Sequence, residues 1–286
     1  MKKAICVGIN NYPGTGNDLK GCVNDATDWN SLLEYAGFQT EVLLDSQATR
    51  SNILNALNNL VTGATSGDEI VFTYSGHGTS VADTSGDEPD AYDEALYVYD
   101  GILLDDELRA IFQKVAPDIH IVVISDSCFS GTVTRALISE FGKARYIKTD
   151  EIPPEAKLRK RFLSEEDMIE VLVSGCSDSE YSYDANIDGR WNGAMSAYAT
   201  SVIRKGQTYR EFYEKLRGLL PSQQYPQTPQ LEGSDANKDR TVFATNTEPL
   251  PKPEPEPETN IWTWLTKYWW VIVIVIIVAI ILWRIF

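Results

Sequence analysis

Cysteine and histidine are scarce in this sequence, with 4 and 2 of them among 286 residues. The cysteines lie far apart and form no CxxC pair, which excludes a zinc framework and the dense disulfides of a small secreted domain. We therefore expect reduced thiols in a reducing compartment. The cysteines are Cys6, Cys22, Cys128 and Cys176.

Basic side chains are in the minority, because 25 Lys and Arg stand against 41 Asp and Glu, for a net charge of -16. A chain this acidic repels a phosphate backbone, so nucleic acid is excluded as an expected partner. Hydrophobic residues make up 43% of the chain and charged residues 23%. This composition excludes disorder of the whole chain and leaves enough apolar material for a globular core.

Long hydrophobic runs are absent except near the C-terminus. The stretch 268–283 carries no charge and spans roughly 24 Å as a helix, while 261–286 reaches about 37 Å with its charged ends snorkelling. A spacer at 246–260, rich in alternating proline, precedes it and cannot pack into a core. We predict a single transmembrane anchor at 261–286; a buried helix or strand of a soluble domain is the alternative.

A signal peptide is also missing from the N-terminal residues, where the apolar run at 4–9 is too short for one. We therefore expect a single-pass membrane protein with a C-terminal tail anchor. Its globular part should face the cytoplasm, and 261–286 should contact the lipid bilayer.

Short β-branched runs alternate with helical patterns over residues 1–245. This alternation predicts an α/β fold with a mainly parallel central sheet flanked by helices. In such sheets ligands bind at the carboxyl ends of the strands. The expected strands are 3–9, 38–44, 69–75, 120–125, 170–174 and a weaker pattern at 241–244, and the expected helices are 25–36, 51–61, 105–115, 193–204 and 209–219.

Two predicted strand ends carry residues suited to nucleophilic catalysis. His77 lies between two glycines after one strand, and Cys128 follows another among small residues. A thiolate can attack a carbonyl, a histidine can lower the thiol pKa and protonate the departing amine, and backbone N–H groups can hold the oxyanion. The alternatives are a small buried thiol and a hydrogen-bonded loop histidine, and His120 and Cys6 suit those structural roles better.

Further motifs accompany these two in a fixed order along residues 1–245. They are Gly8-Ile9-Asn10-Asn11-Tyr12, Leu19 to Ala26, Tyr74 to Gly78, Asp126 to Gly131, Ser174 to Asp178, Gly193 to Ser196 and Gln227 to Leu231. In this order they resemble the caspase-like cysteine peptidases of the metacaspase type (clan CD, family C14), including their prokaryotic relatives. The spacing of His77 and Cys128 agrees with the caspase pattern, although the QAC[RQG]G flank is absent.

The resemblance implies the caspase–hemoglobinase fold over 1–245. It divides this domain into a large-subunit-like part at 1–142, a linker at 143–167 and a small-subunit-like part at 168–245. It also implies an endopeptidase that cleaves after Arg or Lys, unlike true caspases, which cleave after Asp.

The resemblance assigns roles to individual residues. Cys128 matches the nucleophile, His77 the general acid/base, and the backbone N–H groups of Gly78 and Cys128 match the oxyanion hole.

The pocket for the basic side chain matches Asp126, Asp25, Cys22 and Ser75. Two carboxylates at strand ends suit a guanidinium or ammonium group. Asp25 has a rival interpretation as an N-cap or first-turn acid, and Asp126 as a structural acceptor.

One stretch, 83–107, contains ten acids and no Lys or Arg. Carboxylates this dense either repel one another or hold a hard cation such as calcium. The resemblance matches Asp93, Asp105 and Asp106 to calcium ligands, but Arg135 stands at the fourth ligand position. Three alternatives follow. A neighbouring hydroxyl or a water molecule replaces the missing calcium ligand, Arg135 neutralises the acidic cluster without a metal, or the cluster is a solvated acidic loop. We expect no cofactor for the chemistry itself, with calcium as a possible activator.

The linker is basic, with seven Lys or Arg side chains in 143–161. An enzyme that cuts after basic residues would find a substrate in its own chain, so we predict self-processing there. The candidate positions are Arg159, Lys160 and Arg161. The alternative is an exposed linker that docks on an acidic membrane or on the acidic loop.

These observations together predict a membrane-anchored cysteine endopeptidase with a monomeric catalytic domain. Its substrates would be proteins or peptides with Arg or Lys before the scissile bond. One rival is a catalytically silent caspase-like scaffold that assembles partners at a membrane, against which the intact Cys–His pair argues. A second rival, an acidic calcium-binding membrane protein, leaves the glycine-flanked histidine unexplained.

Overall fold

The computed structural model describes residues 1–82, 92–128, 142–148, 164–177 and 180–244. The chain divides into a main unit, Met1–Ile187 with Trp191–Pro253, and a second unit, Asp188–Arg190 with Glu254–Phe286. Of the second unit the structure describes only Asp188–Arg190. The elements below belong to the main unit, except that β11 begins at Arg190.

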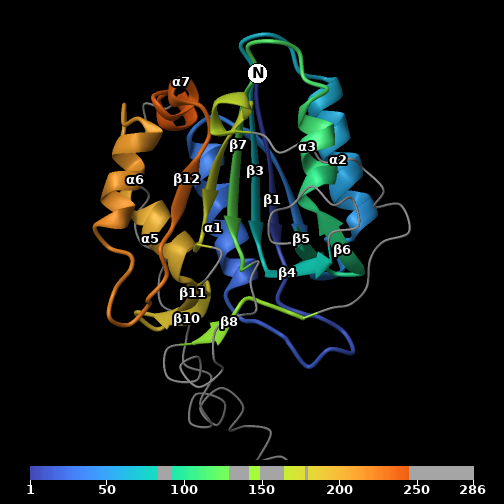
Figure 1. The fold of residues 1–286 in the computed structure, drawn as a ribbon, viewed down its shortest axis with the longest axis vertical. Coiled ribbons are helices and arrows are strands. Elements are labelled where there is room, and N and C mark those ends of the chain that lie inside the picture. Colours follow the sequence, from blue (N-terminus) through green and yellow to red (C-terminus); the bar gives the residue numbers. More distant parts are fainter. Residues whose placement is uncertain (83–91, 129–141, 149–163, 178–179, 245–286) are drawn as a thin grey trace, which may run out of the picture. The chain divides into compact units, whose positions relative to one another are not determined.

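A six-stranded sheet forms the centre of the main unit, in the order β12-β9-β7-β3-β1-β2 (Figure 1). Its strand pairs are parallel, except for the antiparallel pair of β12 and β9. The register aligns Gly8 with Ser75 and Ser75 with Asp126, so the carboxyl ends of these strands meet at one edge of the sheet. The strands are β1 (Lys2–Gly8), β2 (Gln39–Leu44), β3 (Glu69–Ser75), β7 (His120–Asp126), β9 (Glu170–Ser174) and β12 (Gln230–Glu232).

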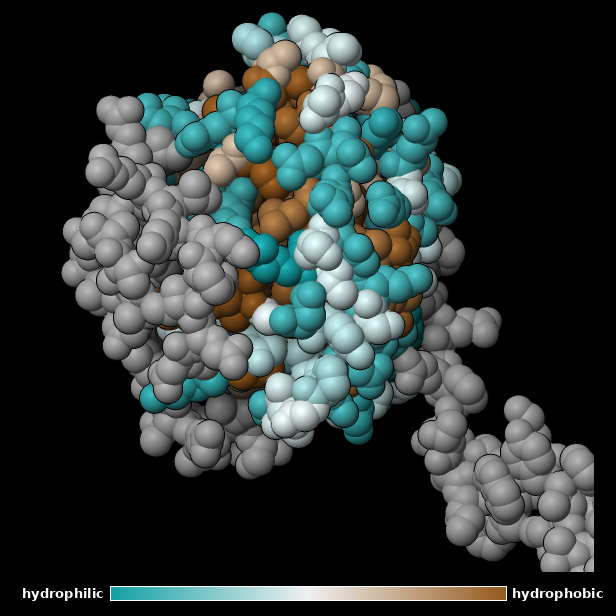
Figure 2. Space-filling view, turned by 90° about the vertical axis from the view of Figure 1, so that its right-hand side faces the viewer, coloured by the Kyte–Doolittle hydropathy of each residue, from teal (hydrophilic) through white to brown (hydrophobic). Residues whose placement is uncertain are grey.

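Helices cover both faces of this sheet, and each face has its own hydrophobic core. Successive side chains of β3 point to opposite faces of the sheet and so pack into different cores. Val71 lies in the first core, and Ile70 and Phe72 lie in the second. The first core includes α1 (Cys22–Tyr35), α5 (Ala194–Val202) and α6 (Tyr209–Arg217), and the second α2 (Arg50–Thr62) and α3 (Asp105–Phe112). Figure 2 views the molecule from the α2 and α3 side, where hydrophilic residues cover most of the described surface.

The sequence of α2 explains why it begins, ends and packs as it does. The Thr49 hydroxyl accepts the Asn52 N–H at the first turn, a cap that contributes about 1 kcal/mol, and Gly63 ends the helix. Ile53 and Leu57 are buried against the sheet, one helical turn apart.

Two three-stranded sheets lie outside the central one. One consists of β4 (His77–Ala82), β5 (Tyr92–Val98) and β6 (Gly101–Leu104), and begins one residue after β3. The other consists of β11 (Arg190–Gly193), β10 (Tyr183–Ile187) and β8 (Lys143–Ala144). Figure 1 shows β4, β8 and β10 near the carboxyl ends of β3 and β7.

The predicted α/β class and the five main strands are confirmed, with ends shifted by one residue at most. The weaker strand predicted at 241–244 is wrong: Val242–Ala244 form a 3-10 turn, and Gln230–Glu232 are the edge strand instead. The first helix begins at Cys22 with Gly21 as its N-cap, so Asp25 lies inside the first turn and is not the cap. A short helix, α7 (Asp235–Lys238), and 3-10 turns at Asp45–Gln47 and Glu165–Asp167 complete the described elements.

Within the described ranges no helix is long and apolar enough to cross a bilayer. The predicted spacer at 246–260 and the predicted anchor at 261–286 lie outside those ranges.

Candidate active site

His77 and Cys128 lie at the ends of neighbouring parallel strands. His77 follows β3 after a single glycine and opens β4, while Cys128 comes two residues after β7. Both side chains are fully buried, at 0% exposure. The fold therefore brings the predicted base and the predicted nucleophile to the same edge of the sheet.

The environment of His77 determines which ring nitrogen carries the proton. Its Nε2 lies 2.6 Å from the carbonyl oxygen of Asn17, which can only accept, so Nε2 carries the hydrogen. Nδ1 then has a free lone pair and makes no hydrogen bond to a described group. Burial lowers the pKa of His77 to about 3, although the Asn17 carbonyl opposes the shift. The ring is thus a neutral base whose available nitrogen is Nδ1.

The glycines beside His77 are required by packing. A Cβ at Gly76 would lie 2.6 Å from the Tyr12 hydroxyl, which accepts the His77 N–H. A Cβ at Gly78 would collide with the carbonyl oxygen of Cys128. Glycine on both sides lets the histidine turn and the cysteine turn pack directly against each other.

The Cys128 sulfur contacts the backbone of Ser182, the residue that precedes β10. It accepts the Ser182 N–H at 2.7 Å and lies 3.4 Å from the Ser182 carbonyl oxygen. A hydrogen bond to Cys128 and burial together raise the pKa of Cys176 well above its usual value, so the second thiol stays protonated.

The substrate pocket predicted from the sequence contains a side chain of the protein itself, Arg145. Its guanidinium is fully buried, at 0% exposure. Nη2 lies 2.8 Å from Asp25 Oδ2 and 3.2 Å from Asp184 Oδ1. Nη1 donates to the Ser75 hydroxyl at 2.7 Å and lies 3.3 Å from Asp126 Oδ2.

Backbone N–H groups hold two of these carboxylates in place. Gly193 N–H donates to Asp25 at 2.9 Å, and Ser196 N–H donates to Asp126 at 2.8 Å. Both donors stand at the start of α5, where unpaired N–H groups favour negative charge. A Cβ at Gly193 would strike the Arg145 guanidinium, so this position needs glycine.

Burial and neighbouring charges shift the pKa values of two residues of the pocket, Asp25 and Cys22. Burial raises the pKa of Asp25 to about 6; the Arg145 guanidinium lowers it, and Asp126 adds to the rise. Burial also raises the pKa of Cys22 well above its usual value, so this thiol is a neutral wall of the pocket beside Ser75. The described site therefore concentrates negative charge around one cation.

The carbonyl oxygen of Arg145 lies between two backbone donors. Gly78 N–H donates to it at 2.9 Å and Cys128 N–H at 3.2 Å. These are the two N–H groups that the family resemblance assigns to the oxyanion hole. They converge on the peptide carbonyl of the residue whose side chain fills the acidic pocket.

The predicted calcium ligands are only partly described. Asp105 and Asp106 stand in the first turn of α3, where Arg109 lies 3.3 Å and 4.0 Å from their carboxylates. Asp93 lies on β5, and its side chain is outside the described part of the structure, as is Arg135. Among the described side chains no group of three His, Cys, Asp or Glu could hold a metal ion.

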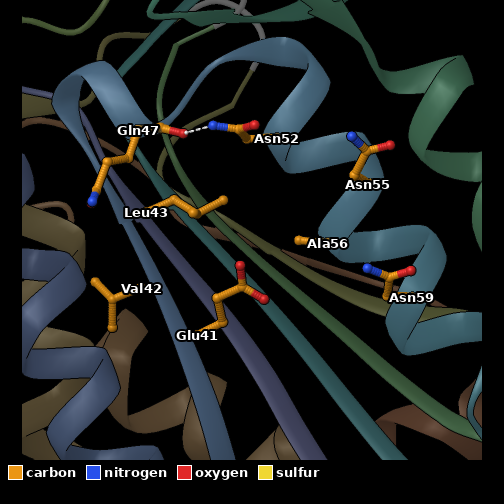
Figure 3. Close-up of a pocket in the computed structure, with 8 residues that line it drawn as sticks. All are labelled: Glu41, Val42, Leu43, Gln47, Asn52, Asn55, Ala56 and Asn59. Atoms are coloured by element: carbon orange, nitrogen blue, oxygen red, sulfur yellow. Dashed lines mark hydrogen bonds between the residues drawn. The ribbon is translucent and has the colours of Figure 1, made fainter.

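The predicted self-cleavage positions Arg159, Lys160 and Arg161 also lie outside the described residues. A surface hollow that the structure does describe is unrelated to the catalytic pair. It lies between β2 and α2 and is lined by Glu41, Val42, Leu43, Gln47, Asn52, Asn55, Ala56 and Asn59 (Figure 3). Its polar groups are mostly amides, and one of them, the Asn52 side chain, donates to the Gln47 carbonyl.

Several residues of the site escaped prediction from the sequence, among them Asn17, Arg145, Ser182, Asp184, Gly193 and Ser196. Gly193 and Ser196 belong to a motif that supported the family resemblance. The sequence therefore marked these positions, but it did not indicate that their N–H groups bind the pocket carboxylates. Asn17 acts through its backbone carbonyl and Asp184 stands on a short polar strand, and neither has a local signal.

Comparison with known proteins identifies relatives over most of the chain. A family model described as "Metacaspase, peptidase C14 domain" matches residues 2–136. Metacaspase-1 of Scheffersomyces stipitis is 31% identical over 288 residues, covering 82% of this chain and 70% of the relative. Metacaspase-1 of Cryptococcus neoformans is 33% identical over 297 residues, covering 85% of this chain and 64% of the relative.

A solved structure has the same fold. The crystal structure of protein GSU0716 from Geobacter sulfurreducens matches with a TM-score of 0.68 and 28% identity. The match covers 86% of this chain and 99% of that protein.

Proposed function

The chain belongs to the metacaspase family of C14 cysteine peptidases, and on that premise we propose that it cleaves peptide bonds after arginine or lysine. Cys128 is the nucleophile and His77 the general acid/base. One observation carries the proposal: the Arg145 side chain is buried among three carboxylates while its carbonyl oxygen meets two N–H donors. An arginine of a substrate would make the same contacts.

The chemistry follows from these positions. His77 Nδ1 takes the proton of the Cys128 thiol, and the thiolate attacks the carbonyl carbon of the residue in the pocket. The Gly78 and Cys128 N–H groups stabilise the negative oxygen that forms. The carbon–nitrogen bond breaks, and His77 gives its proton to the departing amine. Water then hydrolyses the thioester, which releases a carboxylate and restores the thiol.

The pocket suits arginine better than lysine. The two terminal nitrogens of the Arg145 guanidinium face opposite walls of the pocket. Nη1 contacts Ser75 and Asp126, and Nη2 contacts Asp25 and Asp184. A lysine ammonium is a single point of charge and cannot contact both walls in the same geometry. We therefore propose that lysine is accepted at a lower rate than arginine.

Hydrolysis of fluorogenic peptides ending in Arg, Lys or Asp tests the proposal, with calcium or with a chelator, beside Cys128→Ala. Turnover of Arg peptides faster than Lys peptides, and none after Cys128→Ala, is the expected result. Cleavage after Asp alone would refute the assignment of the pocket. The absence of turnover under every condition would favour a catalytically silent scaffold.

The membrane anchor and calcium activation remain proposals based on the sequence. Flotation of the full chain with lipid vesicles, compared with a chain ending at 245, tests the anchor, since only the longer chain should float. The chelator arm of the peptide assay tests calcium, and equal rates in both arms would refute activation.

A further inference from the structure

Two tyrosine side chains hold the main chain of His77. The His77 N–H donates to the Tyr12 hydroxyl at 2.8 Å, and the Tyr74 hydroxyl donates to the His77 carbonyl at 2.7 Å. Both tyrosines are buried, at 1% exposure. Tyr12 lies in the loop after β1 and Tyr74 near the end of β3, so two separate segments converge on the backbone of one residue.

The two hydroxyl groups are also hydrogen-bonded to each other. Tyr74 has a single hydroxyl hydrogen, and its oxygen lies 2.7 Å and 2.8 Å from the carbonyl oxygens of His77 and Tyr97, which can only accept. Tyr74 therefore accepts the hydrogen bond that Tyr12 donates. The three hydrogen bonds form a closed cycle, from the His77 N–H to Tyr12, from Tyr12 to Tyr74, and from Tyr74 back to the His77 carbonyl.

Gly76 makes room for this hydrogen-bond cycle. A Cβ at this position would lie 2.5 Å from the Tyr74 hydroxyl oxygen and 2.6 Å from the Tyr12 hydroxyl oxygen. Burial raises the pKa of both phenols, so the two hydroxyls stay protonated. The cycle is therefore a fixed support that does not titrate together with the histidine.

Tyr12 contacts the imidazole of His77 as well as its main-chain N–H. The two rings meet edge-on, with centroids 4.7 Å apart and planes at 61° to each other. Asn17, in the same loop as Tyr12, accepts a hydrogen bond from Nε2 of the imidazole at 2.6 Å. The main chain, the ring and Nε2 of His77 are thus all held, which restricts rotation of the ring and leaves Nδ1 as the nitrogen available for proton transfer.

Tyr209 provides a comparison, because its hydroxyl has a structural role elsewhere in the fold. It is equally buried, at 1% exposure, and its hydroxyl accepts the Phe243 N–H at 3.2 Å. Its ring lies against His120, the first residue of β7, whereas Cys128 lies beyond the other end of that strand. The two tyrosines of the cycle bond instead to His77, and they do so on both sides of its backbone.

We infer that Tyr12 and Tyr74 are positioning residues for His77, and that their hydroxyls fix its backbone and thereby the place of the imidazole beside Cys128. This inference rests on the proposed function, because His77 must transfer protons for its position to affect the rate. Removing either hydroxyl leaves a buried backbone group of His77 without its partner, so the residue shifts to find another. A misplacement of about 1 Å can cost roughly 100-fold in rate.

The test compares Tyr12→Phe, Tyr74→Phe and Tyr209→Phe in the full chain. Each substitution removes one buried hydroxyl and keeps the ring, so Tyr209→Phe is the matched control for the loss of a structural hydrogen bond. For each variant we would measure kcat and KM for an Arg-ended fluorogenic peptide, the urea midpoint of unfolding, and the rate at which iodoacetamide alkylates Cys128. The alkylation is followed by mass spectrometry of the peptide that contains Cys128, and it is repeated in a His77→Ala background.

Tyr12→Phe and Tyr74→Phe should each lower kcat roughly 10- to 100-fold and leave KM within about twofold, because the histidine moves and the acidic pocket does not. Tyr209→Phe should lower the urea midpoint by a similar amount and leave kcat within about twofold of the wild type. An unchanged kcat in either of the first two variants, a loss confined to KM, or the same loss of kcat in Tyr209→Phe would overturn the inference and leave the proposed function intact.

Alkylation of Cys128 separates positioning of the histidine from a general loosening of the site, and it does not depend on peptide turnover. With His77 present, Tyr12→Phe should slow the alkylation several-fold at about pH 7, because a displaced histidine takes the thiol proton less well. In the His77→Ala background the same substitution should have no further effect. An equal effect in both backgrounds, whether faster or slower, would overturn the inference. A wild type that turns over no peptide would refute the proposed function, while the alkylation rates would still decide whether the tyrosines act through His77.

Discussion

Asp25 Oδ2 and Arg145 Nη2 lie 2.8 Å apart, with both side chains at 0% exposure. The two residues are 120 positions apart in the sequence, so the contact links the first helix to the basic linker. A substrate arginine has the same guanidinium, and each residue around Arg145 can be tested for its effect on substrates.

Replacing Asp184 by Asn should weaken arginine recognition more than lysine recognition. Asp184 contacts Nη2, on the wall of the pocket that a lysine cannot reach together with Asp126. We expect kcat/KM for Arg peptides to fall roughly 10- to 100-fold, and the Arg-to-Lys ratio to fall several-fold. Asp167→Asn, which removes the same charge from an exposed turn, should change neither. An unchanged ratio in Asp184→Asn would contradict the role of the third carboxylate.

Arginine recognition should depend on pH through Asp25. Its pKa is about 6 with a guanidinium in the pocket, so Asp25 loses its charge as the pH falls through that value. Because the guanidinium lowers this pKa, Asp25 in an empty pocket has a higher one, and the attraction for arginine weakens as the pH falls from above that higher value toward about 6. Measuring KM for an Arg peptide from about pH 5 to about pH 8 should show a rise toward acid pH. In Asp25→Asn, KM should be high and that step should disappear; a wild-type step that persists in Asp25→Asn would have another source.

Gly78→Ala should abolish activity, because the added methyl group meets the Cys128 carbonyl oxygen and forces the two turns apart. Losing one oxyanion donor alone costs about 100- to 1000-fold in kcat. Gly63→Ala is the matched control, since its Cβ would lie 3.3 Å from the Asn59 carbonyl at a helix end. Comparable activity in the two variants would exclude the assigned oxyanion hole.

Glu69→Gln should stabilise the protein at neutral and alkaline pH. Burial raises the pKa of Glu69 to about 7, against the pull of Lys2, and its carboxylate oxygens make no hydrogen bond to a described group. Below the unfolded pKa the group is neutral in both states and costs nothing; the penalty grows as pH rises and is complete above about 7. Urea unfolding should show a gain of roughly 2–3 kcal/mol for Glu69→Gln at about pH 8 and almost none at about pH 4. An equal gain at both values would exclude ionisation as the cause.

The central sheet was predictable because each strand carries its own signal. Runs such as 69–75 and 120–126 are β-branched, buried on both faces and bounded by polar residues, as parallel strands require. The glycines around His77 and the small residues around Cys128 then marked which strand ends to inspect. Short strands such as β8 and β10 have no comparable periodicity, because pairing with each other and with the site determines their conformation.

The occupant of the pocket could not be read from the sequence. Arg145 is one of seven basic residues in the linker, and only the fold decides which of them reaches Asp25 and Asp184. The role of Asp25 was hard to predict for the same reason. Acidic residues are common in the first turn of a helix, and only the fold brings the start of α5, far away in the sequence, against this one.

The pairing of β9 with β7 has a consequence for what a cut would mean. β7 precedes Arg145 and β9 follows it, and five residue pairs join these strands in the centre of the sheet. The acidic pocket also combines Asp25 and Asp126 from before Arg145 with Asp184 from after it. If the chain is cut in the linker at 143–161, as the sequence predicts, the two polypeptides would therefore share one sheet and one pocket, and they would separate in denaturant but stay together in native solution.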